Sequence, residues 1–180
     1  MRSLCLNFDG SAVRNPGGPG GWGWRLADPA GRLVACDLGR LPADPRVTNN
    51  TAEYEGLIRG LRFLAARRDL FDAVTVRGDS KMVVMQAAGK WRVKAEGLRP
   101  LWAEVAALIG QIGRQRLRFE WVPREQNAEC DELSKGNGRA FHPPSPAVVP
   151  PVPSESCRPN PTRPHATRRT DFVRAVDCRP

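Results

Sequence analysis

The chain has 180 residues, a length typical of one domain, and 41% of them are hydrophobic, which is enough for a core. Its 28 lysine and arginine residues outnumber 19 aspartate and glutamate residues, and the net charge of +9 favours a polyanionic partner. The apolar runs are too short to span a bilayer, so we expect no membrane association.

The five cysteines are widely spaced and form no CxxC pair, so the sequence predicts neither a zinc site nor a disulfide framework. The first eight residues are strand-like and are followed by a charge, unlike a secretory signal peptide. We therefore expect a cytoplasmic protein.

The composition changes near Phe141. Residues 142–180 contain 10 of the 17 prolines, and proline at that density cannot sustain a helix or a central strand. Apolar residues there are too sparse to bury, so disorder or extended polyproline structure is expected. The sequence thus predicts a folded domain over residues 1–140 and a disordered Pro/Arg-rich tail over residues 141–180.

Within the predicted domain, the apolar period changes along the chain. Leu4, Leu6 and Phe8 recur at every second position, which predicts a strand that ends at Asp9. In later stretches the apolar residues lie three and four positions apart, which is the spacing of one face of a helix. The predicted strands cover residues 4–9, 22–26, 33–38, 72–77 and 117–121, and the predicted helices cover 54–65, 80–88, 98–112 and 127–135. Three strands followed by strand–helix alternation predict an α/β fold, a mixed sheet covered by helices.

Four carboxylates lie at the ends of these elements or in the last helix. Asp9 follows the first strand, Glu53 opens the long helix, Asp79 follows the fourth strand, and Asp131 lies in the last helix. If the first and fourth strands are neighbours, Asp9 and Asp79 lie side by side, where open sheets place their sites. Clustered carboxylates repel one another unless cations are bound, and hard divalent ions prefer oxygen ligands.

Each carboxylate also has a structural alternative. Glu53 could close a capping box with Asn50, and Asp79 could be the N-cap of the following helix. Asp131 could belong to a solvated face, and Asp9 could start the turn that it precedes.

Four segments, in this order and spacing, resemble ribonuclease H type 1: "LNFDGSAVRNPGGPGGWGW", "TNNTAEYEGLIRGL", "VRGDSKMVV" and "WVPREQNAECDELSK". The resemblance covers residues 1 to about 138. It implies the ribonuclease H-like fold, a five-stranded mixed sheet flanked by helices. It also implies that Asp9, Glu53, Asp79 and Asp131 are the catalytic metal ligands, so the four structural alternatives are set aside.

The activity implied by the resemblance is that of an endonuclease. It would hydrolyse the RNA strand of RNA–DNA hybrids and leave 5′-phosphate and 3′-hydroxyl ends. The implied cofactor is Mg²⁺, two ions per site, with Mn²⁺ as an alternative. Two such ions, about 3.5–4 Å apart, activate water and stabilise the leaving oxygen. We expect a monomer that binds nucleic acid.

The resemblance also implies substrate contacts. Asn15, Asn49 and Asn50 match residues that contact the RNA strand, and Thr48 matches a residue of a phosphate pocket for the DNA strand. Only the 2′-hydroxyl marks RNA at a given site, so donors and acceptors are needed there. In the structural alternative, Asn15 serves the glycine-rich turn and Asn50 caps the helix.

A basic segment interleaves three cations with an aromatic residue. Lys90, Arg92 and Lys94 flank Trp91, and the segment corresponds to the part of the family that binds the DNA strand. Cations bind phosphates, and an aromatic ring can pack against a sugar or a base. The alternative is a solvated turn with Trp91 in the core.

One feature departs from the family pattern. Many members carry a histidine in the loop before the last aspartate, whereas both histidines here, His142 and His165, lie in the predicted tail. In this shorter loop, Glu125 is the nearest candidate to replace it.

Two other functions are less consistent with these motifs. A catalytically silent nucleic-acid-binding module predicts the loss of at least one acidic ligand, and all four are present. A different nuclease of the same fold, such as a junction resolvase, is disfavoured by the "TNNTAEYEGL" segment.

Overall fold

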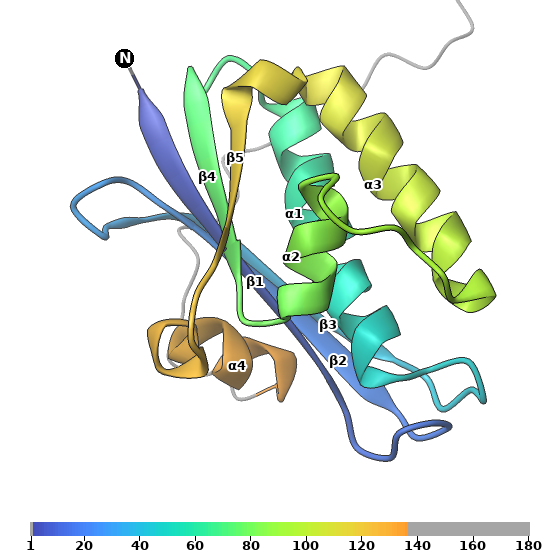
Figure 1. Cartoon of the computed structure of the whole chain (residues 1–180). Helices are drawn as coiled ribbons and strands as arrows, with labels where there is room; N and C mark the ends of the chain where they lie inside the picture. The colour runs from blue at the N-terminus through green and yellow to red at the C-terminus, as the bar shows by residue number, and fades with distance from the viewer. Residues whose placement is uncertain (1, 137–180) are drawn as a thin grey trace, which may run out of the picture. The chain divides into compact units, whose positions relative to one another are not determined.

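The computed structural model describes residues 2–136 of the chain (Figure 1). Its strands and α-helices follow the predicted order. They are β1 (Ser3–Ala12), β2 (Gly20–Ala27), β3 (Leu33–Leu41), α1 (Asn49–Ala66), β4 (Ala73–Gly78), α2 (Lys81–Ala87), α3 (Arg99–Ile112), β5 (Leu117–Trp121) and α4 (Ala128–Ser134). Short 3₁₀ turns precede α3, β5 and α4. The predicted tail over residues 141–180 lies outside the described residues.

The five strands form one mixed sheet in the order β3-β2-β1-β4-β5. Antiparallel pairing joins β3 to β2 and β2 to β1, and parallel pairing joins β1 to β4 and β4 to β5. The predicted five-stranded mixed sheet is therefore confirmed. Because β1 and β4 are parallel neighbours, the residues near their carboxyl ends are brought together.

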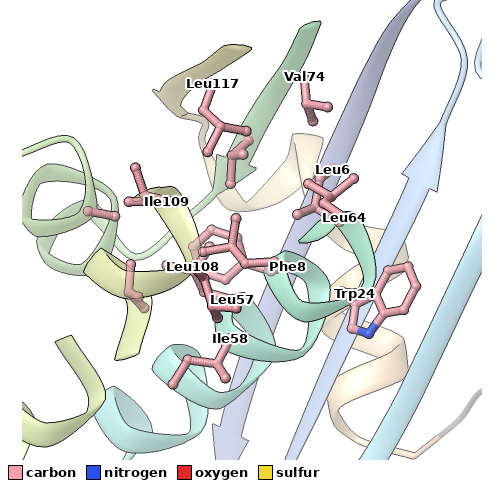
Figure 2. Packing of buried hydrophobic residues seen from close by; sticks show 14 of the residues in the cluster. Leu6, Phe8, Trp24, Leu57, Ile58, Leu64, Val74, Leu108, Ile109 and Leu117 are labelled. Carbon is pink, nitrogen blue, oxygen red and sulfur yellow. The ribbon is translucent and has the colours of Figure 1, made fainter. Parts of the chain in front are cut away.

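Helices cover both faces of the sheet. Helix α1, with α2 and α3 beside it, packs on one face, and α4 packs on the other (Figure 1). Leu6 and Phe8 of β1 point toward α1 and are fully buried with Leu57 and Ile58 (Figure 2). This burial accounts for the alternation that predicted the strand. None of the helices within residues 2–136 is both long and apolar enough to cross a membrane.

Strand β1 is longer than its apolar alternation predicts. It runs from Ser3 to Ala12, so Asp9 lies inside the strand and does not follow it. Strand β4 accompanies β1 only as far as Asn7, beside Arg77, whereas β2 pairs with it up to Ala12. The apolar alternation of β1 therefore stops near the point where its pairing with β4 ends, whereas its pairing with β2 continues to Ala12.

The start of α1 also differs from the prediction. The helix begins at Asn49, so Glu53 lies in its second turn, and the N-cap is Thr48. The Thr48 hydroxyl accepts the N–H of Thr51 at 3.1 Å, and the Thr51 hydroxyl accepts the N–H of Thr48 at 2.8 Å. The alternative capping box between Asn50 and Glu53 is therefore wrong, which leaves the Glu53 carboxylate available for the site.

Helix α1 lies against the backbone of β1. A Cβ atom added at Gly10 of β1 would lie 2.1 Å from the backbone nitrogen of Glu53. One added at Gly56 of α1 would lie 2.5 Å from the carbonyl oxygen of Asp9. Both distances are far below van der Waals contact, so glycine at these two positions permits the close packing.

We expect Gly56→Ala to destabilise the domain by about 1–3 kcal/mol, because the new methyl group must push α1 away from β1. Gly110→Ala in α3 is the matched control, since its added methyl group meets no neighbouring atom within 4 Å. It should stabilise the domain by about 0.5–1 kcal/mol through helix propensity. Urea unfolding measures both changes, and equal effects of the two substitutions would contradict the proposed contact.

Candidate active site

Three carboxylates from separate elements meet where β1 and β4 lie side by side. One oxygen from each of Asp9 in β1, Glu53 in α1 and Asp79 after β4 lies within 4.8 Å of the other two. We call these residues the acidic triad. Asp79 is not a helix cap, because α2 begins at Lys81 with Ser80 as its N-cap residue. The expected juxtaposition of Asp9 and Asp79 is therefore present, and α1 adds Glu53 to it.

The electrostatics of the acidic triad disfavour full ionisation. Asp9 is only 4% exposed, and burial is the main cause that raises its pKa from 3.8 to about 7. The charges of Asp79 and Asp131 act in the same direction, and a hydrogen bond with Ser134 opposes them. Burial, followed by the charges of Asp9 and Asp79, raises the pKa of Glu53 well above its usual 4.5. A bound cation would reverse this effect by favouring the ionised carboxylates.

Glu53 shows most directly that the site suits a cation. Its Oε2 atom is buried and has no hydrogen-bond partner among the described residues. A buried carboxylate oxygen without a donor is unfavourable unless a positive charge compensates it. The donor set of the acidic triad consists of carboxylate oxygens alone, which is the ligand chemistry of Mg²⁺ and Mn²⁺.

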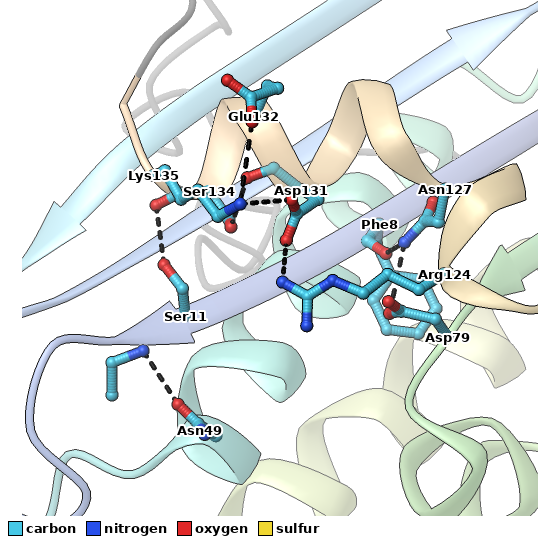
Figure 3. Close-up of polar contacts among 11 residues, drawn as sticks. Phe8, Ser11, Asn49, Asp79, Arg124, Asn127, Asp131, Glu132, Ser134 and Lys135 are labelled. Carbon is cyan, nitrogen blue, oxygen red and sulfur yellow. Dashed lines mark hydrogen bonds and ion pairs between the residues drawn. The ribbon is translucent and has the colours of Figure 1, made fainter.

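Asp131 lies outside the acidic triad. Its carboxylate, at the first turn of α4, accepts hydrogen bonds from Arg124 and Lys135 (Figure 3). Partial burial acts to raise the pKa of Asp131, but these two hydrogen bonds and the two positive charges outweigh burial and lower it. Its charge nevertheless acts on Asp9 and Glu53, so it lies close to them. The structure thus brings three of the four predicted ligands together and pairs the fourth with cations.

Asp79 is held by two neighbours that the sequence did not single out. The Asn127 side chain donates through Nδ2 to Oδ1 of Asp79 at 3.3 Å and to the carbonyl oxygen of Phe8 at 2.8 Å (Figure 3). The indole N–H of Trp121 donates to the carbonyl oxygen of Asp79 at 2.9 Å. An asparagine directly before the last helix was the available signal, but nothing local shows that it turns toward β1.

The loop before α4 lacks the histidine of many family members. Glu125 was the nearest candidate to replace the missing histidine, but it is exposed and lines a cavity together with Cys5 and Arg25. Arg124 of the same loop reaches the site. It hydrogen bonds with Asp131, and its charge acts to lower the pKa of Glu53. The loop therefore contributes a cation to the site, and the role of Glu125 stays a prediction.

Known proteins share this arrangement of elements. A family model described as reverse transcriptase-like matches residues 7–136. The chain is 38% identical over 131 residues to the bifunctional protein Rv2228c of Mycobacterium tuberculosis, covering 73% of this chain and 34% of that protein. The solved N-terminal RNase H domain of that protein, a fusion with maltose-binding protein, matches with a TM-score of 0.67 and 33% identity, covering 78% of this chain and 96% of that chain.

The chain belongs to the ribonuclease H family.

A second solved ribonuclease H bears on the substrate. LC11-RNase H1, isolated from compost by a metagenomic approach, is solved in complex with an RNA/DNA hybrid. That structure matches with a TM-score of 0.66 and 33% identity, covering 74% of this chain and 94% of that chain. This chain spans about a third of the length of the first curated relatives that it matches.

The expected RNA-contacting residues of this ribonuclease H domain lie around the start of α1 and the β1–β2 turn. Asn15 is exposed in that turn, and Asn49 is exposed with its Oδ1 accepting the N–H of Ala12 at 2.9 Å (Figure 3). Thr48 and Asn50 line a groove of about 790 Å³ between the start of α1 and the start of α3. The N-cap of α1 is Thr48, so the alternative in which Asn50 caps the helix is wrong.

The basic segment follows α2 and is exposed. Lys90, Trp91, Arg92 and Lys94 line a depression of about 570 Å³ in front of Leu98. The side chain of Trp91 is 48% exposed, so the alternative that places it in the core is wrong. Because Leu98 also lines the groove beside Thr48 and Asn50, the two hollows adjoin.

We expect Asp9→Asn to stabilise the metal-free domain at neutral and alkaline pH. The folded state binds the Asp9 proton more tightly than the unfolded state does, with a pKa of about 7 against 3.8. Stability of the parent should therefore fall as pH rises from about 4 to 7, and the variant escapes this loss. In EDTA at pH 8 the variant should melt roughly 10 °C higher, and near pH 4 the two should nearly coincide. If the melting temperatures of the parent and the variant differ by the same amount at every pH, the raised pKa of Asp9 is contradicted.

Proposed function

We propose that this domain is a metal-dependent endonuclease that hydrolyses the RNA strand of RNA–DNA hybrids, leaving 5′-phosphate and 3′-hydroxyl ends. The observation that carries the proposal is the acidic triad, in which one buried and two partly buried carboxylates converge. Among the described residues no lysine or arginine forms an ion pair with them, and the Oε2 atom of Glu53 has no hydrogen-bond partner. Membership of the ribonuclease H family and the match to LC11-RNase H1, solved with an RNA/DNA hybrid, support the choice of substrate.

The residues that would hold the metal are Asp9, Glu53 and Asp79, with Asp131 as the fourth ligand. Two bound Mg²⁺ or Mn²⁺ ions supply a water nucleophile and relief of the charge that develops at the phosphate. Asp131 is the ligand whose recruitment needs a rearrangement, because Arg124 and Lys135 must release its carboxylate at least in part.

Arg124 contributes positive charge beside the acidic triad. Its side chain is 66% exposed although it pairs with Asp131, so a substrate phosphate can reach the guanidinium. Guanidinium groups bind phosphate oxygens with two parallel hydrogen bonds. We assign to Arg124 the binding of a phosphate oxygen close to the scissile bond.

Recognition of the two strands would be divided between two surfaces. Asn15, Asn49 and Asn50 offer amide donors and acceptors for 2′-hydroxyl groups of the RNA strand. Thr48, beside Asn50 in the groove, would contact a phosphate of the DNA strand. The basic segment Lys90–Lys94 continues along the DNA strand, with its cations on phosphates and Trp91 against a sugar or a base.

The decisive assay compares substrates. In Mg²⁺, the full chain should cut the RNA strand of a labelled hybrid and leave duplex RNA and duplex DNA intact. Asp9→Asn and Asp79→Asn should each reduce kcat at least 1,000-fold (about 4 kcal/mol of barrier), because each removes a ligand of the metal. Circular dichroism should show both variants folded. Full activity of Asp9→Asn in Mg²⁺ would refute the proposal.

The basic segment predicts a binding defect that leaves the chemistry intact. In Lys94→Ala, the slope of log K against log salt should become shallower by roughly one unit, because one phosphate is no longer neutralised. KM should rise and kcat should stay nearly constant. Trp91→Ala should weaken binding with little change of slope, since stacking releases no counterions.

The affinities can be measured by fluorescence anisotropy in an Asp9→Asn background, where the hybrid is not cut. Arg32→Ala is the matched control, because it removes the same charge from a side chain that is 83% exposed in the β2–β3 turn. If Lys94→Ala and Arg32→Ala change the slope equally, the segment acts only through net charge.

A further inference from the structure

Asn127 is a buried amide at the junction of β1, Asp79 and α4. It is 2% exposed and directly precedes α4. Its Nδ2 group donates both to the carbonyl oxygen of Phe8 and to Oδ1 of Asp79 (Figure 3). Its Oδ1 atom accepts a hydrogen bond from Nδ2 of Asn7 at 3.1 Å. Every polar atom of the side chain therefore has a partner, which is what burial requires.

The donor and the acceptor of each hydrogen bond around Asn127 follow from the groups that can only accept or only donate. A carbonyl oxygen such as that of Phe8 can only accept, so the NH₂ group of Asn127 must face it. The same NH₂ group then faces Asp79, and the oxygen of Asn127 faces Asn7. Asn7 must therefore donate, which turns its own oxygen toward the Cys5 thiol, 3.3 Å away. In this series of hydrogen bonds, Cys5 donates to Asn7, Asn7 donates to Asn127, and Asn127 donates to the Asp79 carboxylate.

We propose that Asn127 is a positioning residue for Asp79, and that Asn7 acts by orienting Asn127. The inference rests on the proposed function, in which Asp79 is a metal ligand. By binding Oδ1, the amide fixes the rotation of the carboxylate and leaves Oδ2 for the cation. Neither asparagine contacts the reacting atoms.

Asp79 depends on few contacts, because among the described residues only the Asn127 amide and the neighbouring Asp9 carboxyl hydrogen bond with its side chain. It lies in the two-residue link between β4 and α2, and Trp121 holds only its backbone carbonyl. Repulsion from the Asp9 and Glu53 carboxylates favours rotation of Asp79 away from them. A hydrogen bond from behind the carboxylate opposes that rotation.

The chemical type of the donor matters as much as its place. Asn127 is neutral, so it orients Asp79 without adding a positive charge that would compete with a divalent ion. Asp131 shows the contrast, because the two side chains that hold its carboxylate, Arg124 and Lys135, are both cations. Partners that orient a metal ligand from outside typically change metal affinity by 10–100-fold.

The test measures Mg²⁺ affinity of the full chain by NMR titration, independently of cleavage. Asn127→Ala should raise the Kd for Mg²⁺ about tenfold, and Asn7→Ala should raise it by a smaller factor, about threefold by the same reasoning. If Asn7 acts through Asn127, its substitution should change nothing further in the double variant.

Gln86→Ala is the matched control. Gln86 is also a buried amide, but its Oε1 accepts the Tyr54 hydroxyl at 2.6 Å and it lies in α2, outside this chain of hydrogen bonds. It should lose stability as Asn127→Ala does and keep the Kd of the parent for Mg²⁺. An equal loss of affinity in Gln86→Ala would show that general destabilisation is the cause and would overturn the proposal.

Two further results would overturn it. One is an unchanged Kd in Asn127→Ala, and the other is a threefold effect of Asn7→Ala that persists in the double variant. If Asn127→Ala does not fold, the test depends on Asn7→Ala, which leaves the hydrogen bonds from Asn127 to Phe8 and Asp79 in place. An unchanged Kd for Mg²⁺ in Asn7→Ala would then contradict the inference. A parent that binds Mg²⁺ with these dependences but does not cut a hybrid refutes the proposed function and leaves the positioning role standing.

Discussion

Helix α1 and strand β1 touch backbone to backbone because Gly10 and Gly56 carry no side chain. This contact sets the height of α1 above the sheet at the point where Asp9 and Glu53 emerge. Phe8 and Leu57, buried directly beneath, hold the helix in that position. Packing therefore keeps these two carboxylates close to each other, although their charges repel. Glu53 and Asp9 lie together because the apolar core is strong enough to keep them there.

The protein compensates this repulsion only in part, through the charge of Arg124, although it is rich in cations. Among the described residues, none of the observed salt bridges involves Asp9, Glu53 or Asp79, whereas Asp131 has two cationic partners. Burial is the main cause of the raised pKa values of Asp9 and Glu53, and the charges of the neighbouring carboxylates add to it. A divalent ion can therefore reach these three carboxylates without displacing a lysine or arginine from them, and their mutual repulsion reduces stability until an ion is bound.

The sequence predicts what local patterns encode. Alternation of Leu6 and Phe8 and the helical repeat of Leu57 and Ile58 reflect burial on one face, so the elements and their order follow from periodicity. The end of β1 was misjudged because hairpin pairing beyond Asp9 needs no apolar side chain. A residue such as Asn127 cannot be found in this way, because its partners Phe8 and Asp79 are 119 and 48 residues distant.

The candidate site divides in the same manner. The resemblance to ribonuclease H supplied Asp9, Glu53 and Asp79, whose convergence depends on the β1–β4 pairing that the structure confirms. It could not supply the neighbour of Asp131, because the shortened loop departs from the family pattern. Arg124 is the first residue of the 3₁₀ turn Arg124–Gln126, and it contacts Asp131 because of the direction in which that turn points its side chain. This direction is a property of the folded loop and not of the local sequence pattern.

The distribution of charge suggests how binding and cleavage are separated. A hybrid is a polyanion, so Lys90 and Lys94 would attract it, and the acidic triad would repel it until cations are bound there. The basic segment and the groove at Thr48, neither of which the acidic triad lines, would then hold the two strands without metal. The approach of the scissile phosphate to the acidic triad would become favourable once cations compensate the charges of its carboxylates. In the proposed function, affinity for the hybrid would then depend mainly on the surface cations, and turnover would depend on the carboxylates and on the neutral amide that we propose as the orienting group of Asp79.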